Sequence, residues 1–247
     1  MEGKKLAVII LAAGKGSRMK SSLAKALHPL ASRPLLVHVL EKVKPLNPDK
    51  VIIVVGHQSD KVKEAIASSS IEFVEQKEQL GTGHAVQQAE KVLKDLDGTV
   101  LILCCDMPFL KTTTLSQLID VHLDTNAECT LLSLKTLEKR DFGRIVRDEM
   151  GAIKQIVENR DASEEEKLID EFNSGVYCFN KEYLFNALDE IDNSNAQQEY
   201  YLTDTVKWIK EKGLKIGSIQ TEDGLEILGI NSVEDLEIAE NFLKSST

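Results

Sequence analysis

The 247-residue sequence predicts an α/β protein with a mainly parallel, doubly wound sheet covered by helices on both faces. Three observations lead to this fold class. Short apolar runs rich in Val and Ile have the length and composition of buried strands. These runs alternate with segments whose apolar residues recur at helical spacing. Strands separated by helices require right-handed crossovers, which place the strands parallel to one another in a Rossmann-like sheet.

The first half of the chain holds the clearest alternation of strands and helices. Pro34 stands where a helix can begin, and Pro45 and Pro48 lie just beyond its expected end. Gly56 and Gly81 mark further boundaries between elements. We expect strands at residues 6–11, 51–55, 71–74, 99–104 and 129–134, and helices at residues 35–43, 59–68, 82–96 and 112–123.

The pattern changes after about residue 138. Two alternating runs joined through residues 148–151 predict a hairpin, and a charged segment at 161–168 predicts an exposed helix or loop. Neither repeats nor a linker interrupt the sequence, so we expect a single domain over 1–247, with parts at about 1–138 and 139–231 and a C-terminal helix at 232–247. The remaining expected elements are strands at 142–147, 152–157, 172–179, 215–219 and 225–228, and helices at 181–188, 203–212 and 233–243.

Charge and composition limit the classes of partner. The formal net charge of −10 disfavours nucleic acid. Residues 1–25 nevertheless contain six Lys or Arg and one Glu, a local positive patch that suits a small anionic ligand. No apolar run approaches the roughly 18 residues of a membrane span. The run at 6–11 continues into a basic glycine loop, so we interpret it as a strand rather than an export signal and expect a cytoplasmic protein.

The cysteines and histidines show no metal-ligand pattern. The four cysteines form no C-x-x-C pair, and no two of the five histidines have zinc-ligand spacing. We therefore expect buried, reduced thiols and no zinc site.

The loop after the first strand predicts a phosphate-binding site. Gly14 and Gly16 let backbone N–H groups approach an anion, and Lys15, Arg18 and Lys25 supply positive charge. Met19 stands where the third glycine of a dinucleotide fingerprint belongs, and no G-K-[ST] closes a P-loop. An ordinary glycine-rich turn is the alternative, and the clustered cations favour the phosphate site.

Several residues after other strands have two interpretations. Asp106 ends an apolar strand, so it is either a turn or helix-capping residue or a ligand for a hard cation. Gln76 either hydrogen-bonds to the edge of a nucleobase or is an ordinary loop residue. Arg140 and Arg144 either contact phosphate or lie on an exposed hairpin. Ligands of doubly wound sheets bind at the carboxyl ends of strands, which favours the functional interpretation of Asp106.

Taken together, the chain resembles the uridyltransferase half of the bifunctional N-acetylglucosamine-1-phosphate uridyltransferase/glucosamine-1-phosphate acetyltransferase family. The resemblance covers most of the sequence and implies the nucleotide-diphospho-sugar transferase fold. The motif at 11–19 is shared across sugar nucleotidyltransferases. The segments at 80–85 and 158–162 are typical of fewer members, and their resemblance implies uridine and N-acetylglucosamine phosphate as ligands. The matching segments are LAAGKGSRM (11–19), EQKEQLGTGHAVQQA (75–89), CDMP (105–108), DFGRIVRD (141–148), IVENRDA (156–162), FNSGVYCF (172–179), QQEYYLTD (197–204) and GIN (229–231).

The resemblance implies a role for particular residues. Arg18, Lys25 and Asp106 are the implied catalytic residues, and Asp106 with Asn231 is implied to bind Mg²⁺, or Mn²⁺ in its place. The implied nucleotide-binding residues are Leu11, Ala12, Ala13, Gly14, Lys15, Gly16, Gln76, Gly81 and Thr82. The implied sugar-binding residues are Cys104, Cys105, Gly143, Glu158, Asn173, Tyr201 and Thr203.

The implied reaction joins UTP and N-acetylglucosamine 1-phosphate into UDP-N-acetylglucosamine, with release of pyrophosphate. Two departures from the family pattern stand out. Cys105 occupies a position that is usually Gly, and no hexapeptide repeats follow Asn231, so neither acetyltransferase activity nor trimerisation through a β-helix is expected. The alternatives are a nucleotidyltransferase of the same fold with another base or sugar or polyol phosphate, and a weakly catalytic regulatory protein that binds UDP-sugar. The sequence makes no prediction of the oligomeric state.

Overall fold

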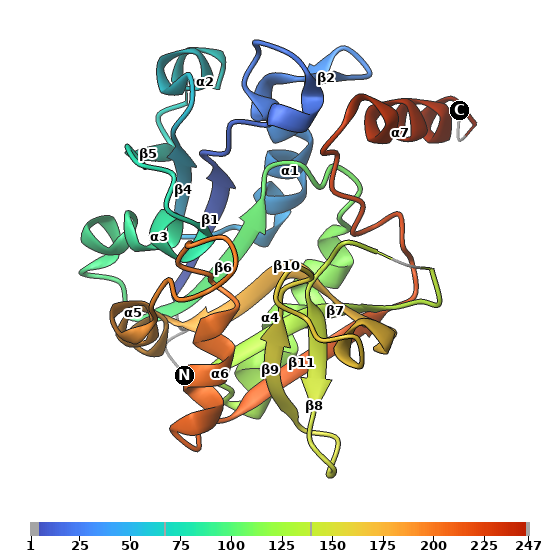
Figure 1. The fold of residues 1–247 in the computed structure, drawn as a ribbon. Coiled ribbons are helices and arrows are strands. Elements are labelled where there is room, and N and C mark those ends of the chain that lie inside the picture. The colour runs from blue at the N-terminus through green and yellow to red at the C-terminus, as the bar shows by residue number, and fades with distance from the viewer. Residues whose placement is uncertain (1–4, 67, 139, 246–247) are drawn as a thin grey trace.

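A computed structural model describes residues 5–66, 68–138 and 140–245. Its centre is a nine-stranded mixed sheet with the order β11-β7-β10-β6-β1-β4-β5, to which β8 and β9 are joined through β10 (Figure 1). The strands of this sheet are β1 (Lys5–Ala12), β4 (Lys50–Val55), β5 (Ile71–Glu75), β6 (Gly98–Cys104), β7 (Cys129–Lys135), β8 (Arg144–Arg147), β9 (Ile153–Val157), β10 (Glu171–Asn180) and β11 (Ile216–Thr221).

Strand β1 lies at the middle of the parallel part of the sheet. It pairs with β4 on one side and β6 on the other, so that Val8 lies opposite both Val51 and Leu101. Successive side chains of β1 point to opposite faces of the sheet. Ile9 therefore packs into one core cluster, and Ile10 packs into the other. Burial on both faces explains why the run is continuously apolar.

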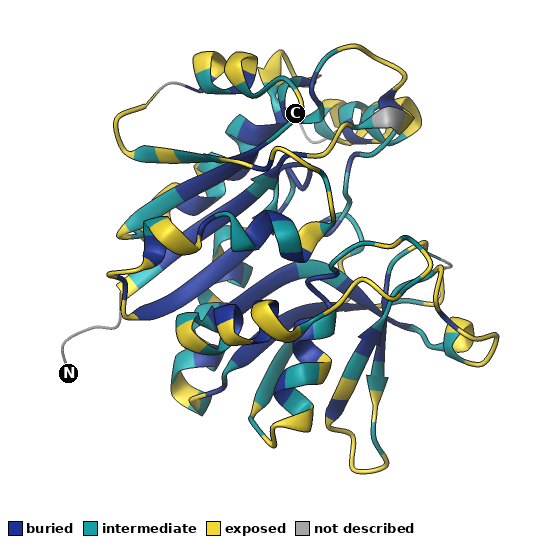
Figure 2. Cartoon of the chain, turned by 60° about the vertical axis from the view of Figure 1, so that its left-hand side comes forward, coloured by how far each residue is buried: buried dark blue, intermediate teal, exposed yellow. Residues whose placement is uncertain are grey.

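Helices cover both faces of the sheet, as the sequence predicts. One core cluster lies under α3 (Thr82–Gln87), α5 (Lys181–Glu190) and α6 (Asp204–Glu211). The other lies under α1 (Leu35–Val43), α2 (Ser59–Ala65) and α4 (Thr112–Thr125). Figure 2 shows the buried strands between these two partly exposed layers.

Two helices expected from the sequence end early. The helix expected at 82–96 stops at Gln87 and continues as a 3₁₀ turn at Glu90–Leu93. The side-chain amide of Gln88 donates to the carbonyl of His84 at 2.9 Å, which is the acceptor that the N–H of Gln88 would use in an α-helix. The helix expected at 59–68 ends at Ala65, where serines that bond to one another follow. Ala67 lies outside the described residues.

The second part of the chain extends the same sheet with antiparallel pairs. Strand β10 runs antiparallel to both β6 and β7, and β8 with β9 forms the expected hairpin. The strand expected at 225–228 is wrong, because this segment forms a turn. The side chain of Asp223 accepts from the N–H of Leu225 at 3.1 Å and holds the turn closed.

The C-terminal helix α7 (Val233–Ser245) packs beside a small hairpin of β2 (Pro29–Leu30) and β3 (Arg33–Pro34). Ala239 of α7 belongs to a third apolar cluster, which also contains Met19 and Leu30. This cluster fixes the far end of the glycine-containing loop. Among the described residues, no helix has the length and apolarity to cross a membrane.

Candidate active site

The carboxyl ends of β1, β5 and β6 meet around one cavity of about 280 Å³, which we call the loop cavity. Parallel neighbouring strands end at the same edge of a sheet, so residues distant in sequence converge there. The residues that line the loop cavity are Leu11, Ala13, Gly14, Lys25, Gln76, Gln79, Gly81, Thr82, Ala85, Cys104, Cys105, Asp106 and Glu199. The structure thus brings together most of the nucleotide-binding residues expected from the sequence.

The glycine-containing loop wraps closely around Lys25. Gly16 has a φ of +62°, and a Cβ added there would lie 2.9 Å from the Cβ of Lys25. Met19 is buried and anchors the loop, and its N–H donates to the carbonyl of Gly16 at 2.9 Å. Met19 stands where a dinucleotide fingerprint would have glycine, and here its side chain packs into the third apolar cluster.

Lys25 joins two polar residues from opposite halves of the chain. Its ammonium group forms an ion pair with the carboxylate of Asp106 and donates to the amide oxygen of Asn231 at 2.6 Å. Arg18 donates to the same amide oxygen at 2.9 Å. Burial lowers the pKa of Lys25, but the Asp106 carboxylate outweighs it and the pKa is raised above the usual value. Lys25 therefore stays charged at neutral pH.

The oxygens around Lys25 also have the chemistry of a divalent-cation site. The amide nitrogen of Asn231 donates to the carbonyl of Gly229 at 3.0 Å, so its oxygen faces Lys25 and Asp106. One carboxylate and one amide oxygen converge on a single position that holds a positive charge. Such oxygen donors fit Mg²⁺.

The segment around Gly81 links the two halves of the chain. The N–H of Gly83 donates to the carbonyl of Tyr200, and the N–H of Tyr200 donates to the carbonyl of Leu80, both at 2.8 Å. The hydroxyl of Thr82 accepts from the N–H of Leu202 at 3.0 Å. Gly81 has a φ of +115°, and a Cβ there would lie 2.5 Å from the carbonyl oxygen of Tyr200. This close approach requires glycine.

The two cysteines before Asp106 both line the loop cavity. Burial raises the pKa of Cys104 to about 12 and that of Cys105 still further, so both thiols are neutral. Cys105 also packs among the apolar residues of the core beneath α1 and α4. Its side chain thus occupies the space between that core and the loop cavity.

Five of the seven expected sugar-binding residues lie around the β8–β9 hairpin, β10 and the segment before α6, whereas Cys104 and Cys105 line the loop cavity. The hydroxyl of Thr203 donates to Glu158 at 3.1 Å. A Cβ added to Gly143 would lie 3.5 Å from the Glu158 carboxylate, and the carbonyl of Gly143 accepts from the N–H of Asn173 at 2.8 Å. Glu158 and Tyr201 line a second cavity of about 460 Å³, which we call the hairpin cavity. Burial raises the pKa of Glu158, and nearby carboxylates add to this effect.

Some residues of this region were not singled out from the sequence. Asp161 accepts from the hydroxyl of Tyr201 at 3.2 Å, and Gln197 donates to the same hydroxyl at 2.8 Å. Tyr177 donates to the side chain of Asn173 at 2.9 Å. All three lie inside the matching segments quoted above, which were the available signal. Their partners became visible only in three dimensions.

Other expected site residues lie outside the lining of both cavities. The side chain of Ala12 packs in the core beneath α1. Lys15 and Arg18 are exposed, and Arg18 reaches Asn231. Arg144 is buried, donates to the side chain of Asn159 at 2.7 Å and lies over the ring of Phe172. Arg144 is therefore neither an exposed hairpin residue nor directed at the loop cavity.

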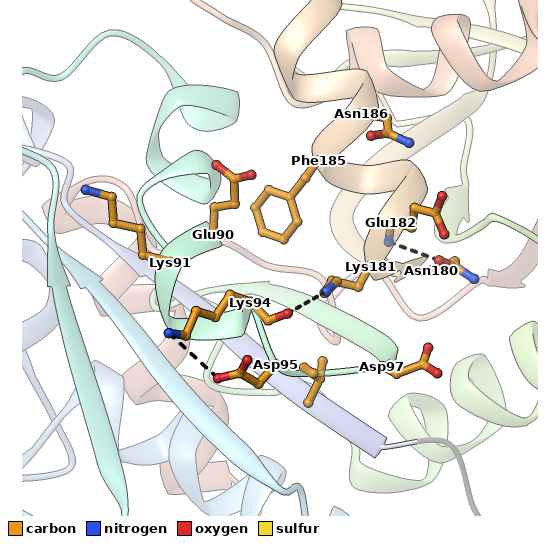
Figure 3. Close-up of a pocket in the computed structure, with 11 residues that line it drawn as sticks. Glu90, Lys91, Lys94, Asp95, Asp97, Asn180, Lys181, Glu182, Phe185 and Asn186 are labelled. Atoms are coloured by element: carbon orange, nitrogen blue, oxygen red, sulfur yellow. Dashed lines mark hydrogen bonds and ion pairs between the residues drawn. The ribbon is translucent and has the colours of Figure 1, made fainter.

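A larger cavity of about 970 Å³ lies away from these sites (Figure 3). It is lined by Asp97, which precedes β6, and by Asn180, which ends the antiparallel strand β10. It therefore opens at the amino end of β6, opposite to Asp106. Lysines and carboxylates alternate around it, and Lys94 pairs with Asp95 at 4.0 Å. This balance of charge gives no preference for a phosphate.

Solved structures share this architecture. The crystal structure of a UDP-glucose pyrophosphorylase complexed with UDP-glucose superposes with a TM-score of 0.81 at 19% identity, over 99% of this chain and 100% of that one. The apo form of a UDP-glucose pyrophosphorylase gives the same TM-score at 18% identity, over 99% of each chain. These likenesses confirm the expected nucleotide-diphospho-sugar transferase fold.

Sequence relatives and a family model agree with the fold. The bifunctional protein GlmU of Oceanobacillus iheyensis is 45% identical over 236 residues, which are 96% of this chain and 52% of that protein. The GlmU protein of Bacillus subtilis is 42% identical over the same shares. The chain thus spans about half the length of these curated relatives. The model of the MobA-like NTP transferase domain matches residues 8–171. Because that match covers more than half of the sequence, the chain belongs to the MobA-like NTP transferase domain family.

Proposed function

We propose that the chain transfers a uridylyl group from UTP to N-acetylglucosamine 1-phosphate, forming UDP-N-acetylglucosamine and pyrophosphate. The observation that carries this proposal is the convergence of Lys25, Asp106 and Asn231 at the edge of the loop cavity. Relatives that are 42–45% identical are named as GlmU proteins, which supports the choice of substrates.

The proposed binding mode places the nucleotide in the loop cavity. The base lies near Gln76, Gly81 and Thr82, and the phosphates lie beside the backbone of the glycine-containing loop. Arg18 and Lys25 neutralise the triphosphate. The sugar phosphate lies toward Glu158 and Thr203, on the side of the hairpin cavity.

A divalent cation, Mg²⁺ with Mn²⁺ as a substitute, completes the proposed site on Asp106 and Asn231. When bound, it supplies charge neutralisation and orientation to the reacting phosphates. The same two oxygens that would hold the cation contact Lys25 here, so Lys25 would be free to turn toward the phosphates when the cation is bound.

The chemical step is an in-line displacement at the α-phosphorus of UTP. An oxygen of the sugar phosphate forms the new P–O bond while the bond to pyrophosphate breaks, and the leaving group carries away the electron pair. A phosphate monoester is ionised near neutral pH, so no general base is required. Lys25 stabilises the negative charge on the transferring phosphoryl group, and the cavity holds the reactants in line.

A panel assay tests the proposal. The purified chain is incubated with Mg²⁺, each of four nucleoside triphosphates, and N-acetylglucosamine 1-phosphate, glucosamine 1-phosphate or glucose 1-phosphate, and pyrophosphate release is measured. We expect the fastest release with UTP and N-acetylglucosamine 1-phosphate. A faster reaction with another pair would assign a different substrate to the same fold. Tight binding of UDP-N-acetylglucosamine without pyrophosphate release would instead identify a regulatory protein. We also propose that this reaction takes place in the cytoplasm.

A further inference from the structure

Gln76 is a buried polar side chain whose contacts are only half satisfied. It follows β5, its side chain lines the loop cavity, and the residue is 3% exposed. The N–H of its backbone donates to the carbonyl of Val55 at 2.8 Å, which fixes its position at the edge of the sheet. A polar group held this deep in a cavity wall is expected to have a defined partner.

The orientation of the Gln76 amide follows from its neighbours. Its Nε2 lies 3.0 Å from the carbonyl oxygen of Gly81, which only accepts hydrogen bonds. The nitrogen rather than the oxygen of the amide must therefore face Gly81. The same Nε2 lies 3.0 Å from Nδ1 of His84. Because an amide nitrogen has no lone pair to offer, Nδ1 of His84 must be the acceptor, and the imidazole proton lies on Nε2.

These two contacts use both N–H groups of the Gln76 amide. Among the described parts of the chain, no residue donates to the remaining Oε1. The side-chain amide of Gln76 in the wall of the loop cavity therefore offers only its Oε1, a hydrogen-bond acceptor, because both N–H groups already have partners. A ring N–H of a nucleobase would complete this arrangement.

We propose that His84 is a positioning residue that, together with the carbonyl of Gly81, fixes the polarity of Gln76 and thereby selects the base. This inference rests on the proposed function, in which the base lies at Gln76. Uracil presents an N–H at ring position 3, which the fixed Oε1 accepts. Cytosine has the same shape, but its ring nitrogen 3 carries a lone pair instead of a hydrogen. That nitrogen and Oε1 would both be acceptors, so no hydrogen bond forms between them. A buried site that lacks the matching hydrogen bond rejects such an analogue strongly.

The test compares two substitutions of similar size at position 84. His84→Asn keeps an acceptor oxygen near the place of Nδ1, whereas His84→Leu removes it. The dissociation constants of UTP and CTP are measured by calorimetry with Mg²⁺ for the wild type and both variants. His38→Leu is the matched control, because His38 lies on α1 and contacts the carbonyl of Leu30 outside the loop cavity. Thermal unfolding followed by circular dichroism checks each fold.

We expect the wild type, His84→Asn and His38→Leu to prefer UTP over CTP by at least about tenfold, and His84→Leu to lose most of that preference, since one matched hydrogen bond contributes about that factor. If His84 had only a structural role, His84→Leu would weaken the binding of UTP and of CTP by the same factor. The inference would be overturned if His84→Leu kept the wild-type preference for UTP over CTP. It would also be overturned if His84→Asn lost as much of that preference as His84→Leu. Wild-type binding of CTP as tight as that of UTP would overturn it without any variant.

Binding and turnover separate this inference from the proposed function. The calorimetric preference for UTP is measured without an acceptor sugar, so it is defined even for a chain that releases no pyrophosphate. A preference for UTP without pyrophosphate release supports the role of His84 and contradicts the proposed reaction. Equal pyrophosphate release from UTP and CTP supports nucleotidyl transfer and contradicts the role of His84.

Discussion

The ammonium group of Lys25 and the carboxylate of Asp106 form a largely buried ion pair between residues that lie 81 positions apart. Lys25 comes from the segment after β1, and Asp106 follows β6, the neighbour of β1 in the sheet. A buried ion pair contributes little net stability because both charges lose their water. Its position in the wall of the loop cavity fits the proposal that both groups take part in the reaction.

Replacing the Asp106 carboxylate tests the proposed cation site. Asp106→Asn keeps the side-chain size but removes the charge, so we expect pyrophosphate release to fall by at least about 100-fold. Asp223→Asn is the control, because Asp223 pairs with Lys111 on the surface outside the loop cavity. Normal turnover of Asp106→Asn with saturating Mg²⁺ would remove Asp106 from the proposed mechanism.

Removing the Lys25 charge tests its role in the transition state. For Lys25→Met we expect kcat to fall by about 100-fold or more, because a donor aimed at developing charge acts mainly in the transition state. Lys50→Met removes the exposed pair with Glu72 and serves as the control. Steady-state kinetics of pyrophosphate release separate kcat from KM, and a change confined to the KM for UTP contradicts the prediction.

The Glu158 carboxylate is expected to act on the sugar phosphate rather than on the nucleotide. Glu158→Gln retains the size of the side chain that accepts from Thr203, but it removes the negative charge and replaces one acceptor oxygen with an N–H donor group. We expect the KM for the sugar phosphate to rise by about tenfold, because the loss of one hydrogen bond to a charged group weakens binding by about that factor. The KM for UTP should be unchanged. Glu182→Gln, at the cavity of Figure 3, is the control. A matching rise in the KM for UTP argues against this division of the site.

Crowding at Gly81 is expected to affect stability. Gly81→Ala places a Cβ 2.5 Å from the carbonyl oxygen of Tyr200 at a φ of +115°. We expect a loss of about 2–4 kcal/mol in the free energy of unfolding, measured by urea denaturation. Gly151→Ala also has a positive φ, but nothing lies within 4 Å of the added Cβ, so it should lose only about 1 kcal/mol. Equal losses would show that crowding against Tyr200 contributes nothing.

The carboxyl group of Asp204 is expected to make stability depend on pH. Burial raises its pKa from 3.8 to about 6, and the carboxylates of Asp192 and Asp161 add to the shift. The folded state therefore holds the proton more tightly than the unfolded state, so the stability contributed by the protonated form is present below pH 3.8 and lost as pH rises through about 6.

Asp204→Asn removes this titration. We expect the variant to be more stable than the wild type above pH 6 by about 1 kcal/mol, a small value because the side chain is partly exposed to solvent. Below about pH 4 the difference should vanish. Urea denaturation of both proteins between pH 4 and pH 8 measures it, and a constant difference across that range would contradict the prediction.

Local patterns were sufficient for much of the fold. The alternating faces of residues 6–11, the helix beginning after Pro34, and the hairpin at 142–157 each depend on neighbours within one element. The early end of α3 was not predictable, because it depends on where the side chain of Gln88 finds its acceptor. The turn at 225–228 depends likewise on the hydrogen bond to Asp223.

The sequence by itself determined most of the strands, the glycine-containing loop, the edge of the sheet at which charged residues gather, and the family that the motifs resemble. Only the tertiary structure decided which of those residues face one another. Lys25 meets Asn231 across 206 positions, and Tyr201 meets Asp161 across 40. The polarity of Gln76 depends on His84 and Gly81 together. Periodicity specifies the face of an element, whereas a contact between elements depends on how the whole sheet and its helices pack.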